Sequence, residues 1–160
     1  MNNDIASSTQ RLRELSPRVL ALDEQARQTV DRVETFLRDE CRLELPASTL
    51  VARDADNASE VLLSYDRHHD AFKLWVVLRS PQLDERNKPQ FAPDGTPIFG
   101  ESTITAWKDC DRTIRMMSFA KLPELLNQLT MRVEQTIEVS ERAATAGAQL
   151  LAAMNGSVKS

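Results

Sequence analysis

The feature that most constrains the fold is an apolar stripe in the segment "KLPELLNQLTMRVEQTIEVSERAATAGAQLLAAM". Steps of three and four residues place side chains on one face of an α-helix. Pro123 suits a first helical turn, and Gly156 marks the end. A helix of about 31 residues is roughly 46 Å long, whereas a compact domain of this size is about 39 Å across, so the helix should extend beyond the core. The stripe comprises Leu126, Leu129, Val133, Ile137, Ser140, Ala144, Ala148, Leu151 and Met154.

An exposed stripe of this length needs a partner, because an unpaired apolar face lowers solubility. The partner is either the first long helix of the same chain, folded back, or a second copy of the chain. We predict a homo-oligomer, most simply a dimer. The expected interface residues are Val133, Ile137, Ala144, Ala148 and Leu151.

A second long helix is predicted near the start of the chain. Ser16 suits an N-cap and Pro17 the first helical position. Alternatively, Leu12 and Leu15 continue the same apolar spacing, which would start the helix earlier with Pro17 as an irregularity. Residues 1–10 and 155–160 are expected to be flexible ends. The apolar face comprises Val19, Leu22, Ala26, Val30, Val33, Leu37 and Cys41.

Between the helices, alternating apolar residues over 60–79 predict an antiparallel hairpin that turns at 67–70. Trp75 and Val77 lie on its second face, so we expect both faces to be covered. A short strand is predicted at 49–53 and another ending near Trp107, followed by a shorter helix at about 109–119. The expected fold is therefore α+β, a single domain with two long helices flanking a small antiparallel sheet.

Residues 80–102 form the longest irregular segment, with four of the seven prolines and two of the four glycines. Pro93-Asp94-Gly95 indicates a turn within a small hairpin. Long loops of this kind are often functional. We predict that this loop binds a partner through Phe91, Pro93, Asp94, Ile98 and Phe99.

The only two histidines lie in the stretch "SYDRHHD", Ser64 to Asp70. A metal site made by Asp66, His68, His69 and Asp70 is one interpretation. Neighbouring strand residues point to opposite faces, however, and the chain has no third histidine. We favour a polar hairpin turn without a bound metal.

Other catalytic patterns are missing from the sequence. It contains no GxxxxGK[ST], GxGxxG, GxSxG or CxxC motif. Cys41 and Cys110 are expected to be buried free thiols. Arg112 and Arg115 could together bind a phosphate or carboxylate, but a solvated helix face is the favoured interpretation.

Charge and hydropathy narrow the class of partner. The net charge is −4 and no segment has a dense basic block, which makes nucleic acid an unlikely partner. No apolar run is long enough for a membrane span and the first residues do not resemble a signal peptide, so we expect a cytoplasmic protein.

These observations together favour a non-enzymatic protein-interaction module, an adaptor, chaperone or inhibitor, that needs no cofactor. The helical stripe exceeds what the core can bury, a loop carries aromatic residues, and complete catalytic sets are lacking. A metal-dependent hydrolase using the residues around His68 and His69 is the alternative.

Overall fold

The structure is a computed structural model that describes residues 2–56 and 58–157. It confirms an α+β fold with a long helix at each end. The elements are α1 (Asn2–Thr35), a π-helical turn η1 (Phe36–Glu40), β1 (Ala47–Arg53), β2 (Glu60–His68), β3 (Ala71–Pro81), β4 (Phe99–Ala106), a 3₁₀ turn η2 (Trp107–Asp109), α2 (Arg112–Phe119) and α3 (Leu122–Ser157).

The four strands form one antiparallel sheet in the order β1-β2-β3-β4. The predicted hairpin is its centre, where β2 and β3 pair without a register shift from Glu60↔Arg79 to His68↔Ala71. Pro46, which interrupts the helical spacing, directly precedes β1. Residues 99–102, assigned to the irregular segment by the sequence, instead begin β4, whose residue Phe99 pairs with Pro81.

The helices bury one face of the sheet, in the half that contains the β2–β3 turn. Leu63, Tyr65 and Leu74 project from that face into a cluster with Trp107 and with residues from both long helices. α1 contacts α2 and β3, whereas α3 contacts β1 and β2. The contributions of α1 and α3 to the cluster are Ala26, Val30, Leu122, Leu125 and Leu129.

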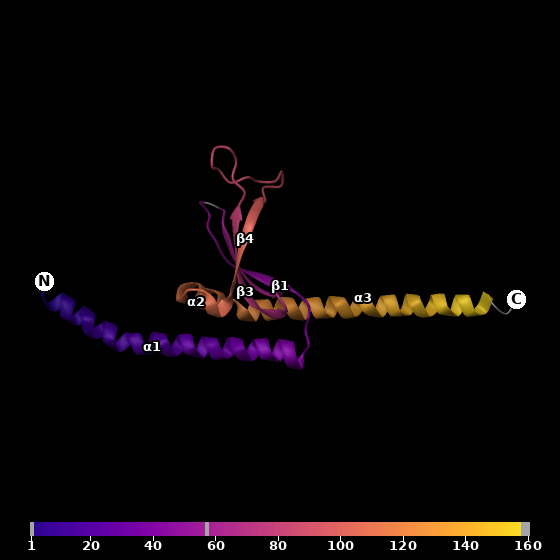
Figure 1. Ribbon diagram of the computed structural model, residues 1–160, viewed down its shortest axis with the longest axis horizontal. Coiled ribbons are helices and arrows are strands. Elements are labelled where there is room, and N and C mark those ends of the chain that lie inside the picture. The colour runs from indigo at the N-terminus through magenta and orange to yellow at the C-terminus, as the bar shows by residue number, and fades with distance from the viewer. Residues whose placement is uncertain (1, 57, 158–160) are drawn as a thin grey trace.

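The two long helices run in the same direction and are offset along it, so that their free ends lie at opposite ends of the molecule (Figure 1). Residues 5–22 of α1 and 134–154 of α3 are all exposed. The prediction that the last helix extends beyond the core is confirmed. α1 also begins earlier than Ser16, with Pro17 inside it, which agrees with the alternative start.

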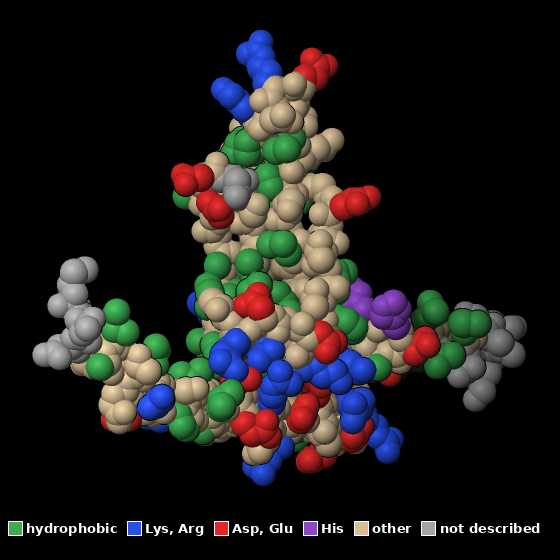
Figure 2. Space-filling model, turned by 60° about the vertical axis from the view of Figure 1, so that its left-hand side comes forward, with side chains coloured by type: hydrophobic (Ala, Val, Ile, Leu, Met, Phe, Trp, Pro, Cys, Tyr) green, Lys and Arg blue, Asp and Glu red, His purple; other side chains and the backbone are tan. Residues whose placement is uncertain are grey.

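The upper half of the sheet rises away from the helices and ends in residues 82–98, which we call the tip hairpin (Figures 1 and 2). Hydrophobic side chains lie on this raised part, while a band of basic side chains crosses its base (Figure 2). Three parts therefore project within residues 2–56 and 58–157: the raised sheet and two helix ends.

The shorter helix begins three residues later than predicted. α2 starts at Arg112 because the Asp111 side chain accepts a hydrogen bond from the Ile114 amide, at 3.0 Å, and caps the helix. Residues 2–10 and 155–157, predicted as flexible ends, continue α1 and α3 as helix. The remaining terminal residues lie outside the described part of the chain.

Candidate functional site: the outer sheet face and the tip hairpin

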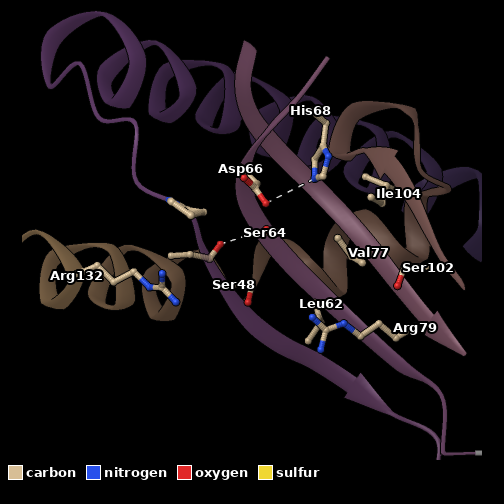
Figure 3. A pocket seen from close by; sticks show the side chains of 12 residues that line it. Ser48, Leu62, Ser64, Asp66, His68, Val77, Arg79, Ser102, Ile104 and Arg132 are labelled. Carbon is tan, nitrogen blue, oxygen red and sulfur yellow. Dashed lines mark hydrogen bonds and ion pairs between the residues drawn. The ribbon is translucent and has the colours of Figure 1, made fainter. Parts of the chain in front are cut away.

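The face of the sheet that points away from the helices carries a cavity of about 310 Å³. Side chains alternate along a strand, so Leu62 and Ser64 point to this face while their neighbours Leu63 and Tyr65 point into the core. The helices lie behind the strands in this view (Figure 3). The cavity is lined by Ser48, Leu62, Ser64, Asp66, His68, Val77, Arg79, Ser102, Ile104 and Arg132, together with Pro46 and Ala47.

The expectation that both faces of the hairpin are covered agrees with the burial of Leu62, Ser64 and Trp75 on the outer face, where Val77 is half-buried. The apolar cluster that the helices pack against includes none of the outer-face residues Leu62, Trp75 or Val77. Trp75 is buried on the outer face beside His68, with ring centroids 5.1 Å apart, and its Nε1 donates to the Asp66 carbonyl at 3.0 Å. A neighbouring imidazole covers this tryptophan, and the sequence pattern alone does not show this.

Two arginines reach this cavity from different elements. Arg79 lies on β3 and Arg132 on α3, on opposite sides of the cavity (Figure 3). Among the described residues, neither forms an ion pair with a carboxylate. The Arg79 guanidinium lies over the Phe99 ring, 5.6 Å from its centroid. The cavity thus offers two positive groups and several hydroxyls beside apolar surface.

The tip hairpin has a defined backbone structure. The backbone of Gln90 is hydrogen-bonded on both sides: its N–H donates to the backbone carbonyl of Gln82 at 2.8 Å, and its carbonyl accepts from the backbone N–H of Ile98 at 2.9 Å. The Ile98 carbonyl in turn accepts from the Gln82 amide at 2.7 Å. Three short segments are therefore held side by side at the base of the hairpin.

Two tight turns complete the tip hairpin. In one, the Asp94 carboxylate accepts hydrogen bonds from the Thr96 hydroxyl at 2.6 Å and its amide at 3.0 Å, and these bonds lower the pKa of Asp94. Gly95 has a φ of +83°, a value that favours glycine. In the other, Asp84 accepts from the amides of Arg86 and Lys88.

The predicted partner-binding residues divide into two groups. Phe91, Pro93 and Asp94 lie exposed on the tip hairpin, and Phe91 has 53% of its surface accessible. Ile98 is exposed at the base, and Phe99 is half-buried at the start of β4. Leu83 is also exposed on the tip hairpin, although the sequence analysis did not select it.

The histidine stretch forms the β2–β3 turn. β2 ends at His68 and β3 begins at Ala71, so His69 and Asp70 alone form the connection, with His69 at a φ of +57°. His68 Nε2 lies 3.8 Å from Asp66 Oδ2 on the outer face. Asp70 instead lines a separate cavity with Arg38 and Phe72. Within the described residues, no group of three or more His, Cys, Asp or Glu side chains is placed to hold a metal ion.

Arg115 is not solvated, contrary to the favoured interpretation. It is 7% exposed and binds the Asp23 carboxylate of α1 in bidentate fashion, with Nη2 at 2.8 Å from both oxygens. Its hydrogen bonds lower the pKa of Asp23. Arg112 remains exposed, 3.8 Å from the same carboxylate. The pair joins α1 to α2 across 92 residues of sequence, which spacing alone does not reveal.

Both cysteines are free thiols, but only Cys110 is buried. Burial raises the pKa of Cys110. Cys41 is exposed because the helical turns end at Glu40, where η1 follows α1. Cys41 therefore does not lie on the apolar helix face that its spacing predicted.

The predicted interface residues lie along the free part of α3. Val133 is half-buried at the edge of the core, whereas Ile137, Ala144, Ala148 and Leu151 are exposed. The structure places all five on one helix, and the described part of the chain leaves every one except Val133 exposed.

Comparison of the chain with protein-family models, with curated proteins and with solved structures finds no match. Across the described residues, none of the helices has the length and apolar content required to span a membrane.

Proposed function

We propose that the protein is a non-enzymatic protein-interaction module, an adaptor, chaperone or inhibitor, that presents the tip hairpin and the outer sheet face to a protein partner. The observation that carries this proposal is the position of these surfaces. The sheet rises beyond the helix-packed core and ends in exposed apolar side chains on a hydrogen-bonded hairpin.

The chemistry of this surface supports a protein ligand. Buried aromatic side chains and arginines contribute most of the energy in many protein interfaces. Phe91 supplies an exposed ring, and Arg79 and Arg132 supply positive groups without a carboxylate of their own among the described residues. A partner segment with apolar residues and at least one carboxylate would match this surface.

A preformed surface also lowers the entropy cost of association. The bonds that Gln90 makes to Gln82 and Ile98 hold the tip hairpin in one conformation before binding. Homodimerisation through the long helices is part of the proposal, because the exposed stripes of α1 and α3 need to be covered.

The test is capture of a partner from extract on the immobilised protein. Deletion of residues 89–97 and the substitution Phe91→Ser should each abolish recovery of the same partner, while thermal unfolding stays nearly unchanged. Phe36→Ser is the matched control, because Phe36 is exposed to a similar extent, 48%, but lies at the start of η1, away from the tip hairpin. Equal capture by Phe91→Ser and wild type would refute the binding role of the tip hairpin.

A further inference from the structure

In the part of the chain that the structure describes, two helix ends project beyond the core and are exposed along their whole length. We call residues 5–22 of α1 the α1 arm and residues 134–154 of α3 the α3 arm. Each arm continues the apolar stripe of its buried half, so large apolar side chains face solvent: Leu12 is 68% and Ile137 53% exposed. The exposed stripe residues are Ile5, Leu12, Leu15, Val19 and Leu22 on the α1 arm, and Ile137, Leu151 and Met154 on the α3 arm.

The arms carry opposite charge. The α1 arm has three arginines and one glutamate, a net charge of +2 in a chain whose total is −4. The α3 arm has three glutamates and one arginine, a net charge of −2. Each arm would repel a copy of itself and attract the other. The charged residues are Arg11, Arg13, Glu14 and Arg18 on the α1 arm, and Glu134, Glu138, Glu141 and Arg142 on the α3 arm.

The arrangement of the arms allows both to be covered at once. α1 and α3 run in the same direction and their arms project from opposite ends of the molecule (Figure 1). A two-fold axis across the helices reverses the second copy, so its α1 arm lies where the first copy's α3 arm projects, and the reverse. The arms are also similar in length, 18 and 21 residues, or about 27 and 31 Å.

We propose that two copies form a closed dimer in which each α1 arm packs antiparallel against the partner's α3 arm. This pairing rests on the dimerisation that is part of the proposed function, and it specifies which helix surfaces are in contact in the dimer. The antiparallel direction brings the N-terminal end of each α1 arm beside the C-terminal end of an α3 arm, where the helix dipoles attract.

The sizes of the residues on the two stripes and directly beside them fit this pairing. In antiparallel helix pairs, stripe positions of one helix face those of the other in opposite order. A register that sets Leu15 against the partner's Ala144 sets Leu12 against the partner's Gly147. Gly147 has no atom within 4 Å of where a Cβ would lie, although glycine weakens a helix interior. The pairing gives this glycine a packing role beneath a leucine.

Charge reversal tests the pairing, with the dimer dissociation constant measured by sedimentation at low salt. Replacing Arg11, Arg13 and Arg18 by Glu should weaken the dimer by at least about tenfold, and replacing Glu134, Glu138 and Glu141 by Lys should do the same. Combining all six substitutions in one chain should restore affinity to within about threefold of wild type. The control reverses Arg86 and Lys88 in the tip hairpin, outside both arms.

A disulfide tests the register. In a Cys41→Ser background, Leu15→Cys combined with Ala144→Cys should form a covalent dimer on oxidation, and neither single variant should. Dimers linked by Ala144→Cys alone would show that two α3 arms pair with each other and would overturn the proposal. The proposal would also be overturned if the protein were a monomer at every concentration, or if the variant with all six charge substitutions failed to recover dimer affinity.

These outcomes are separable from those of the proposed function. If the arm variants do not behave as expected but Phe91→Ser still abolishes capture, the dimer geometry is wrong and the interaction surface stands. If Phe91→Ser has no effect on capture while the variant with all six charge substitutions recovers dimer affinity, the dimer geometry is supported and the binding role of the tip hairpin is refuted.

Discussion

Ser118→Ala should destabilise the protein far more than the loss of one oxygen atom suggests. Ser118 is fully buried, and its hydroxyl accepts a hydrogen bond from Trp107 Nε1 at 2.9 Å. The hydroxyl itself donates toward the carbonyls of Ile114, at 2.6 Å, and Arg115, at 3.1 Å. Removing it leaves the indole N–H, inside a residue that is 1% exposed, without an acceptor.

The expected cost follows from leaving a buried donor unpaired, about 1–3 kcal/mol. Alanine favours helix over serine by a few tenths of a kcal/mol, about 0.5 at most, which offsets little of that cost. For a chain of 160 residues, a loss of about 2 kcal/mol lowers the melting temperature by roughly 4–8 °C. Urea unfolding followed by far-UV circular dichroism, at one fixed protein concentration, gives the free energy of unfolding.

A double-mutant cycle isolates the hydrogen bond. Trp107→Phe removes the donor, so Ser118→Ala in that background should cost close to nothing, although Trp107→Phe is destabilising itself. If Ser118→Ala costs the same with Trp107 as with phenylalanine, the hydrogen bond does not account for the effect. The reasoning would also be refuted if Ser118→Ala left the free energy of unfolding unchanged.

Three further predictions concern two titratable side chains and bound metal. Burial raises the pKa of the Glu34 carboxyl, so the native protein loses stability as pH rises from the ordinary glutamate pKa through the raised one. Glu34→Gln should remove this slope because glutamine does not titrate, while its side-chain oxygen can still accept the hydrogen bond from the Leu74 backbone amide. The hydrogen bonds from Arg115 lower the pKa of Asp23, so their contribution to stability is present above the ordinary aspartate pKa and is lost as pH falls through the lowered pKa. Asp23→Asn should abolish this loss of stability at acidic pH in melting curves. The double variant Asp23→Leu with Arg115→Met should be destabilised less than either single variant. Native mass spectrometry of protein purified without chelators should give a metal-free dimer; one metal per chain, lost with His68→Ala, would support the hydrolase alternative.

The local elements of this fold were predictable because their signals lie in short stretches of sequence. The stripe through Leu129 and Ile137 specifies a helix whatever surrounds it, and its length alone implied an end beyond the core. The alternation from Val61 to Leu78 specified the hairpin, and the polar residues between its strands marked the turn.

The features that the sequence does not reveal depend on contacts between distant segments. Arg115 is buried only because α1 brings Asp23 to it, and no spacing within 112–119 records that encounter. The first half of β4 was assigned to the proline-containing irregular segment, because Phe99 to Ser102 becomes a strand only beside β3. The burial of Trp75 on the outer face was predicted, but the imidazole of His68 that lies beside its ring was not.

The order in which the core residues occur along the chain has a consequence for synthesis. The inner sheet face, with Leu63 and Leu74, is complete well before Leu122, Leu125 and Leu129 exist to cover it. A nascent chain that ends before α3 therefore exposes an apolar sheet and depends on protection from aggregation. Only the first turns of α3 contribute side chains to that core, so the sheet can be covered before the α3 arm packs against anything.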